Sequence, residues 1–291
     1  MVSIMPIPKP RIGAHKSIST SIDLSIDRAI RSTCECLQIF TRPPRRWEAG
    51  KNTLSKTSIV KFIEKSERAN FYDTTIHMPY LPNIATPSEE LFTKSVKVLI
   101  EEIITSKILQ IPYVVTHLGS PLKESESFAL NRVVKSLDIA LESNFNHPLI
   151  LLENSTARKQ KWGTSIEHME AIIKKANKPE KIGICFDTAH AYATGYDIKN
   201  PEILHEIFDQ IDEISHDLVK VIHINDTKGE LGSGIDHHEH LGYGKIGKEC
   251  FRELMQHPRF QNISMILETP KEDEMSDQRN LEFLRNYRKS N

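Results

Sequence analysis

The chain has 291 residues, of which 38% are hydrophobic and 26% charged, as in ordinary soluble globular proteins. Lysine and arginine balance aspartate and glutamate, 38 against 39, so the formal charge of −1 shows none of the basic excess typical of nucleic-acid-binding proteins. No stretch approaches the roughly 18 apolar residues of a membrane span, and residues 1–10 lack the apolar core of a signal peptide.

Short apolar segments alternate with longer amphipathic ones along the chain. Eight short segments predict strands buried on both faces, because they are rich in β-branched or aliphatic residues without strict alternation. They are Arg11–His15, Leu37–Thr41, Thr74–Met78, Tyr113–Leu118, Leu149–Asn154, Ile182–Thr188, Val221–Asp226 and Met265–Thr269.

The segments between these strands have helical patterns and their own start signals. Thr86-Pro87-Ser88-Glu89 predicts a capping box with proline at the first helical position, and Thr164-Ser165-Ile166-Glu167 predicts another, opening a helix through Lys175. Further helices are predicted over Ser21–Arg31, Lys56–Arg68, Asn131–Ser143, Pro201–Ile214, Gly247–Met255 and Met275–Arg288.

Eight strand–helix units without an intervening linker predict an α/β protein, a closed (β/α)8 TIM barrel. A doubly wound open sheet is the alternative, but such sheets commonly stop at about five or six strands. We expect one barrel domain over residues 11–291, preceded by an N-terminal extension over residues 1–10.

The four cysteines are Cys34, Cys36, Cys185 and Cys250. In a chain of this length they do not predict a disulfide framework. The Cys34-x-Cys36 pair could touch a metal, but no second pair completes a site. Reduced thiols are the preferred interpretation.

Potential metal ligands gather at the strand ends, where a TIM barrel has its active site. Nearly every predicted strand ends near one, and the loop Gly232–His240 adds others. The strand-end residues are His15, His77, His117, Glu153, Asp187, His190, His223, Asp226 and Glu268.

Taken singly, each of these residues has an ordinary explanation as a hydrogen-bonded structural group. Several ionisable groups buried together cost several kcal/mol each unless cations compensate them. The set therefore predicts a multinuclear site, and imidazole with carboxylate suits zinc, or alternatively manganese or iron.

Several short motifs occur in a distinctive order. They are Ile12-Gly13-Ala14-His15, Leu152-Glu153-Asn154, Cys185-Phe186-Asp187-Thr188-Ala189-His190, His223-Ile224-Asn225-Asp226, Gly232-Ser233-Gly234-Ile235-Asp236-His237-His238 and Leu267-Glu268-Thr269. With them the chain resembles the endonuclease IV family of zinc-dependent apurinic/apyrimidinic (AP) endonucleases, AP endonuclease family 2, from Ile12 to about Arg288.

The resemblance implies three Zn²⁺ ions, with Mn²⁺ as an alternative at one site. It assigns His77, His117 and Glu153 to the first ion. Glu153, as the catalytic residue, bridges to a second ion, which Asp187, His223 and Glu268 also bind. His190, Asp236 and His238 bind the third ion.

Charge is consistent with such a centre. Four ligand carboxylates under three Zn²⁺ leave a charge of +2, which suits an anionic phosphodiester better than a neutral sugar, and the ions change the formal charge of the chain from −1 to +5. Basic residues after the second and fifth predicted strands would add to the attraction of DNA. They are Arg42, Arg45, Arg46, Lys51, Arg158, Lys159 and Lys161. Without the metal cluster, such short basic runs would be read as solvated surface.

By the same resemblance, Arg45, Tyr80 and Leu81 occupy positions that penetrate the minor groove beside a flipped-out lesion. His15, Asn154, Asn225 and Asp226 are expected to orient ligands or line the groove. The chain departs from the family pattern at Pro43-Pro44, where an asparagine commonly precedes the arginine, and at His237, which replaces an arginine.

The resemblance thus implies a hydrolase of base excision repair that cuts 5′ to an abasic site, leaves a 3′-hydroxyl and a 5′-deoxyribose phosphate, and could trim blocked 3′ ends. Its expected partner is double-stranded DNA with such lesions, not a membrane, and a monomer is expected. An intracellular location follows, cytoplasmic or, in a eukaryotic or viral setting, nuclear or in a viral factory. The alternatives are a sugar isomerase or epimerase with one or two metals, and a non-catalytic DNA-binding protein.

Overall fold

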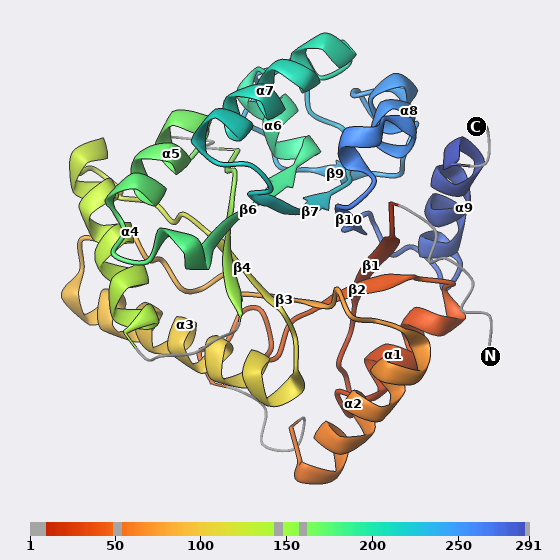
Figure 1. Ribbon diagram of the computed structural model, residues 1–291, viewed down its shortest axis with the longest axis horizontal. Helices are drawn as coiled ribbons and strands as arrows, with labels where there is room; N and C mark the ends of the chain where they lie inside the picture. Colours follow the sequence, from red (N-terminus) through yellow and green to blue (C-terminus); the bar gives the residue numbers. More distant parts are fainter. Residues whose placement is uncertain (1–9, 49–53, 143–147, 157–161, 289–291) are drawn as a thin grey trace.

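A computed structural model describes residues 10–48, 54–142, 148–156 and 162–288. Eight parallel strands close into a barrel in the order β1-β10-β7-β6-β5-β4-β3-β2 (Figure 1). The strands are β1 (Ile12–Lys16), β2 (Cys36–Ile39), β3 (Thr75–His77), β4 (Tyr113–His117), β5 (Leu149–Glu153), β6 (Ile182–Asp187), β7 (Val219–His223) and β10 (Ser264–Leu267). The TIM barrel predicted from the sequence is confirmed, and the open sheet is excluded because β1 pairs with both β2 and β10.

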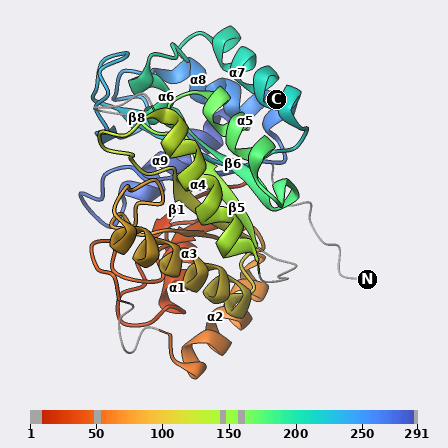
Figure 2. The ribbon, with the colours of Figure 1, turned by 90° about the vertical axis from the view of Figure 1, so that its left-hand side faces the viewer.

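Helices surround the barrel, and Figure 2 shows α3, α4 and α5 side by side on its outside. The helices are α1 (Leu24–Arg31), α2 (Lys56–Ala69), α3 (Glu89–Leu109), α4 (Glu126–Leu141), α5 (Ile166–Lys175), α6 (Thr188–Thr194), α7 (Pro201–Ile214), α8 (Lys248–Gln256) and α9 (Ser276–Arg288), with short 3-10 turns η1 (Pro179–Lys181) and η2 (Pro258–Phe260). Within the described ranges, none of these helices combines the length and apolarity that crossing a membrane requires.

Several helices begin elsewhere than predicted. Helix α1 starts at Leu24 rather than Ser21, and α5 starts at Ile166 behind Ser165, whose side chain makes no capping hydrogen bond. Helix α3 starts at Glu89, and Ser88 caps it by accepting the N–H of Leu91, so Pro87 precedes the helix. Helix α4 starts at Glu126 behind the cap Ser125, earlier than the predicted Asn131. The first residues of α4 are exposed, so the apolar periodicity that marks a helix in the sequence begins only after its first turn. The predicted end at Ser143 lies outside the described residues.

The seventh strand is also shorter than predicted. Strand β7 ends at His223, and Asp226 belongs to β8 (Asp226–Thr227), which pairs antiparallel with β9 (His238–Glu239). The Thr188 hydroxyl accepts the Asn225 N–H at 2.9 Å and donates to the Asn225 carbonyl at 2.7 Å, which takes Asn225 out of the barrel ladder. The small β8–β9 ribbon brings the loop that carries Asp236 and His238 over the barrel mouth.

Alternation along the strands links the core to the barrel mouth. Side chains two residues apart in a strand point to the same face of the sheet. A small buried apolar cluster takes one residue from each of six strands: Cys36, Val115, Leu151, Cys185, Val221 and Ile266. Two residues further along the same strands stand Gln38, His117, Glu153, Asp187, His223 and Glu268. On β1 and β3, Gly13 and Thr75 precede His15 and His77 in the same way, so every barrel strand presents one polar side chain at its carboxyl end.

Gly13, in the first sequence motif, is required by strand packing. A β-carbon at this position would lie 1.8 Å from the backbone oxygen of Cys36 on β2. We expect Gly13→Ala to lower the free energy of unfolding by about 3 kcal/mol, because the strands must separate to admit the methyl group. Urea denaturation measures this, and Ser19→Ala at an exposed site is the control. Equal stability of Gly13→Ala and the wild type would contradict close packing of β1 on β2.

Candidate metal centre

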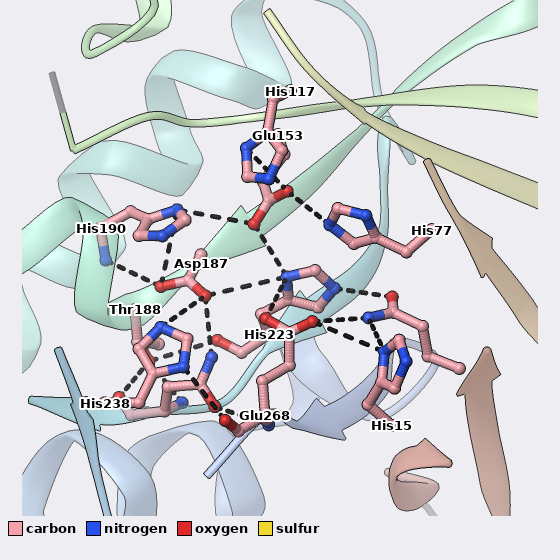
Figure 3. Close-up of polar contacts among 12 residues, drawn as sticks. His15, His77, His117, Glu153, Asp187, Thr188, His190, His223, His238 and Glu268 are labelled. Carbon is pink, nitrogen blue, oxygen red and sulfur yellow. Dashed lines mark hydrogen bonds and ion pairs between the residues drawn. The ribbon is translucent and has the colours of Figure 1, made fainter. Parts of the chain in front are cut away.

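Eight polar side chains form a ring at the carboxyl ends of the barrel strands, seven of them within a strand and Glu268 directly after β10. They are His15, Gln38, His77, His117, Glu153, Asp187, His223 and Glu268. Seven of these residues were predicted to belong to the site, and Gln38 was not. His190, from the first turn of α6, and His238, from β9, face the same region (Figure 3).

Glu153 is the centre of this arrangement and is fully buried. Its Oε2 atom lies 3.1 Å from His77 Nε2 and 3.4 Å from His117 Nδ1. Its Oε1 atom lies 2.9 Å from His223 Nδ1 and 3.5 Å from His190 Nδ1. The two oxygens therefore face different sets of imidazoles (Figure 3). This is the geometry of a carboxylate that can bridge two cations.

A second group adjoins the Oε1 side of Glu153. Ligand atoms of Glu153, Asp187, His223 and Glu268 all lie within 4.8 Å of one another. His223 Nδ1 is 3.4 Å from Glu268 Oε2 and 3.7 Å from Asp187 Oδ2. Three carboxylates thus surround one imidazole nitrogen in a buried place.

A third group forms where the β8–β9 loop crosses α6. Asp236 Oδ1 lies 3.5 Å from His190 Nε2 and 3.2 Å from His238 Nε2. The loop is anchored to α6 because the N–H groups of Gly232 and Gly234 donate to the carbonyls of Tyr192 and Ala193. Both glycines have positive φ angles, 71° and 64°, which other residues adopt at a cost. The nine side chains that the sequence suggested as metal ligands therefore come together in three adjoining groups.

In four of the imidazoles, one ring nitrogen faces a carboxylate of the nearest metal-ligand group. The other ring nitrogen makes a hydrogen bond that holds the ring in place. The acceptors are oxygens that cannot donate, so that nitrogen carries the proton. The pairs are His77 Nδ1 with Met78 O at 2.6 Å, His190 Nδ1 with Asn154 O at 2.8 Å, His238 Nδ1 with Glu268 O at 3.2 Å, and His223 Nε2 with Gln38 Oε1 at 2.8 Å. In each ring the other nitrogen presents a lone pair to a carboxylate.

A lone pair facing a carboxylate is stable only with a cation between them, either a proton or a metal ion. Burial would raise the pKa of Glu153, but the His117 and His223 imidazoles outweigh it and hold that pKa well below its ordinary value. Burial lowers the pKa of His238, yet its contact with Asp236 and the charge of Asp187 raise it to about 9. His238 Nε2 is also buried without a hydrogen-bond partner of good geometry. These nitrogen and oxygen donors fit a metal of the zinc type.

Two asparagines hold Asp187 in place. The Asn154 side chain accepts the Asp187 N–H at 2.6 Å and donates to the Asp187 carbonyl at 2.9 Å. Asn225 Nδ2 donates to Asp187 Oδ2 at 2.8 Å, while Asn225 Oδ1 accepts the N–H of Glu268 at 2.8 Å. Both asparagines lie where a ligand-orienting role requires them.

Asp226 has different contacts from those expected of a residue that orients ligand side chains. Its carboxylate accepts four backbone N–H groups, from Thr227, Gly242, Gly244 and Ile246. It shapes the loop that follows β9, and its influence on the ligands runs through the β8–β9 ribbon. The reason is its position beyond the end of β7, where its side chain no longer points into the barrel mouth.

Two residues with evident roles in the site were not identified from the sequence. Gln38 contacts His15, His223 and Glu268, and the Thr188 hydroxyl fixes the backbone of Asn225. A signal for Gln38 was present, because a lone amide stands among apolar residues of a buried strand, two places after Cys36. Thr188 offered none, since its contact depends on how α6 meets the end of β7.

The residues expected to penetrate DNA lie beside the metal centre. Tyr80 is 59% exposed and Leu81 38%, and Arg45 is exposed too. The Tyr80 N–H donates to the Pro44 carbonyl at 2.9 Å, so the loop after β3 is joined to the loop after β2. The Tyr80 ring lies 6.2 Å from the rings of both His77 and His117. His237 is exposed on the β8–β9 loop.

The expected contribution of Arg42 to DNA attraction is wrong. Arg42 is only 3% exposed, and its Nε donates to the buried Glu102 at 2.6 Å. Its Nη1 donates to the Trp47 carbonyl at 2.8 Å and to Glu101 at 3.0 Å. An arginine next to a buried carboxylate from a neighbouring helix is drawn inward, which the sequence does not reveal. Arg46 is exposed as expected, whereas Lys51, Arg158, Lys159 and Lys161 lie outside the described residues.

Two other candidate groups have structural explanations. All four cysteines are free and buried, and burial raises the pKa of the Cys34 thiol to about 11, so the reduced-thiol interpretation holds. On the outer surface, His205, Glu253 and His257 lie close together. There His205 Nε2 is 2.7 Å from Glu253 Oε1, and His257 Nδ1 accepts the Arg259 N–H at 3.2 Å. Both rings are occupied by hydrogen bonds.

The fold and the site together define a TIM barrel with a cluster of potential metal ligands at its mouth. The family model described as "Xylose isomerase-like TIM barrel" matches residues 26–287. The "Probable endonuclease 4" of Nitrosopumilus maritimus is 41% identical over 274 residues, 93% of this chain and 97% of the relative. The crystal structure of endonuclease IV from Thermus thermophilus aligns with a TM-score of 0.83 at 31% identity, over 96% of this chain and 98% of that one. The chain belongs to the endonuclease IV family and is an endonuclease IV-type hydrolase.

Sugar-converting barrels share the fold. A D-tagatose 3-epimerase-like protein aligns with a TM-score of 0.71 over 95% of this chain and 96% of its own, but at 20% identity. That likeness shows the architecture alone. The interpretation as a sugar isomerase or epimerase is therefore not supported, and membership of the endonuclease IV family also argues against a non-catalytic scaffold.

Metal removal provides a direct test of the centre. Dialysis against a chelator should lower the unfolding temperature by roughly 10 °C, since a tightly bound ion contributes about 4 kcal/mol at a thousandfold excess over its dissociation constant. Added Zn²⁺ should restore the original value. Differential scanning calorimetry measures the shift, with zinc-saturated chelator as the control. Coincident unfolding curves with and without the free chelator would contradict a metal centre in this barrel.

Proposed function

We propose that this chain is a zinc-dependent AP endonuclease of base excision repair. It hydrolyses the phosphodiester 5′ to an abasic site, leaves a 3′-hydroxyl and a 5′-deoxyribose phosphate, and trims blocked 3′ ends. The observation that carries the proposal is the position of Glu153 between two sets of imidazoles, with the Asp236 group adjoining them. A sugar epimerase of one or two metals has no use for the third group.

Three zinc ions, with Mn²⁺ as an alternative at one position, are the proposed cofactors. His77, His117 and Glu153 would hold the first, Glu153, Asp187, His223 and Glu268 the second, and His190, Asp236 and His238 the third. Zinc would supply charge neutralisation for an anionic phosphodiester and an acidified water at neutral pH. The donor set supports this assignment, since it combines imidazole and carboxylate without thiolate.

The protein's own residues supply position and charge balance. Glu153, the proposed catalytic residue, faces one set of imidazoles with Oε2 and another with Oε1, so it would contribute to holding two of the ions, which would neutralise the charge of a phosphate at the mouth. Asn154 fixes the backbone of Asp187 and Asn225 fixes its carboxylate, each by hydrogen bonds. These contacts keep the second and third groups at a constant separation. His15 lies beside Gln38 at the same rim. Its imidazole is neutral at physiological pH, because burial lowers the pKa of His15 to about 3.

Damaged double-stranded DNA is the proposed substrate, with Arg45, Tyr80 and Leu81 entering the minor groove. Support comes from their exposure beside the centre and from the hydrogen bond that joins their two loops. Pro43 and Pro44 restrict the backbone before Arg45, which reduces the entropy lost when that loop meets DNA. His237, exposed beside the ligand His238, would contact DNA with a shorter side chain than an arginine.

We further propose a monomeric, intracellular protein with one barrel domain over residues 11–291.

Removal of the central carboxylate should abolish catalysis. We expect Glu153→Ala to lower the rate of nicking of a duplex with one abasic site by about 1000-fold or more, because two cation positions lose a shared ligand. Strand cleavage on a denaturing gel measures the rate, and elemental analysis counts the metals. The matched control is Glu253→Ala, which removes a carboxylate beside an imidazole on the outer surface.

Three results would contradict parts of the proposal. Wild-type nicking by Glu153→Ala would remove Glu153 from the mechanism. A wild-type protein that binds three metals yet leaves the abasic duplex intact would contradict the assigned activity. One metal per chain, with Asp236 and His238 dispensable, would favour a sugar-converting enzyme.

Two neighbouring arginines should behave in opposite ways. Arg45→Met should weaken binding of abasic duplex by about tenfold and leave stability unchanged, because an exposed cation at the groove is lost. Arg42→Met should destabilise the fold by about 3–5 kcal/mol, because the carboxylate of Glu102 is left buried without a positive charge beside it. Fluorescence anisotropy and urea denaturation measure the two effects. If Arg45→Met binds DNA as tightly as the wild type, Arg45 is not a DNA-contacting residue.

A further inference from the structure

Gln38 is the member of the strand-end ring that has no assigned role. It stands on β2, two residues after Cys36, in the register that places the proposed ligands on six other strands. Its side chain is completely buried. A primary amide carries two N–H donors and one carbonyl acceptor, and such a group is costly to bury unless these are satisfied.

Every polar group of this amide has a partner. Nε2 donates one hydrogen to Glu268 Oε1 at 2.7 Å and the other to His15 Nδ1 at 3.1 Å. Oε1 accepts from His223 Nε2 at 2.8 Å. Two of the three partners, His223 and Glu268, belong to the same proposed metal-ligand group, and their metal-facing atoms lie 3.4 Å apart.

The orientation of the amide follows from the groups around it. Glu268 contacts the amide through Oε1, and its Oε2 lies 3.4 Å from His223 Nδ1. A carboxylate that is to ligate a cation carries no proton and can only accept a hydrogen bond. The nitrogen of the Gln38 amide must therefore face Glu268, since the reverse orientation would set two oxygens 2.7 Å apart. The amide oxygen then faces His223, and only an Nε2–H can bond to it. His223 is thereby held with its Nδ1 lone pair directed at Glu153, Asp187 and Glu268.

We propose that Gln38 is the positioning residue of the second metal group: it selects the Nε2–H tautomer of His223 and aims Glu268 with the same amide. This inference rests on the proposed metal centre. The residue types closest to glutamine in size or chemistry cannot perform both tasks. Glutamate cannot donate to Glu268, methionine has no polar hydrogen, and asparagine is one methylene shorter. One amide thus couples two ligands, His223 at the end of β7 and Glu268 directly after β10, to a single cation position.

The test compares Gln38→Met, which keeps size but loses all three hydrogen bonds, with the wild type. We expect one of the bound metal ions to be held about 10- to 100-fold more weakly and the others to be unchanged. Competition with a chromophoric chelator, followed by elemental analysis, measures each affinity. In ¹⁵N-histidine-labelled protein, the slowly exchanging His223 Nε2–H signal should disappear. Gln256→Met is the matched control, because its amide donates to the Tyr287 carbonyl between outer helices.

Two results for Gln38→Met would contradict the positioning role of Gln38. Wild-type affinity for every ion in Gln38→Met, or equal weakening of all of them, would overturn the positioning role. Gln38→Glu provides a second variant if the methionine chain does not fold: it retains an acceptor for His223 but cannot donate to Glu268, and the same single ion should be weakened. Because the readout is metal affinity and a proton signal, a wild-type protein that binds three ions but does not nick DNA would contradict the proposed function and leave this inference standing.

Discussion

The structure depends on the burial of carboxylates against imidazole lone pairs. Glu153, Asp187, His223 and Glu268 approach within 4.8 Å of one another in the barrel mouth, and Glu153 also faces His77 and His117. Such a group is unstable unless positive charge compensates it. Hydrogen bonds on the opposite ring nitrogens of His77, His190, His223 and His238 keep these imidazoles from turning away. The barrel therefore holds its donors in place before a cation binds, and the energy of cation binding becomes part of its stability.

Barrel closure explains how residues far apart in the sequence meet. Each strand places one side chain in the same ring because a shift of two residues preserves the face of a strand. The third group needs a different device, since Asp236 and His238 come from a loop. Antiparallel pairing of β8 with β9, and the anchoring of Gly232 and Gly234 on α6, carry that loop across the mouth.

Attraction of DNA is proposed to depend more on the metal ions than on basic side chains. The formal charge of the chain is −1, and Arg42 is used within the fold to pair with Glu102. Arg45 is exposed at the rim, joined through the Pro44–Tyr80 hydrogen bond to the loop that carries Leu81. A charge concentrated at the mouth favours a phosphate at the reaction centre over one bound elsewhere on the surface.

The barrel could be predicted from the sequence, because buried strands are a local pattern that repeats eight times. Strand ends rich in His, Asp and Glu marked seven of the nine candidate ligands, and the resemblance to the family supplied the complete set with Asp236 and His238. The positions of Asn154 and Asn225 could be predicted too, since both adjoin ligands in the chain. Contacts between distant segments required the folded barrel. Arg42 turns inward because Glu102 of α3 lies beside it, and Asp226 leaves the barrel because Thr188 binds Asn225. Gln38 acquires its three partners from β1, from β7 and from the residue directly after β10. An amide or an arginine in a sequence carries no mark of the group it will meet, since that depends on how the closed barrel brings its strands and helices together.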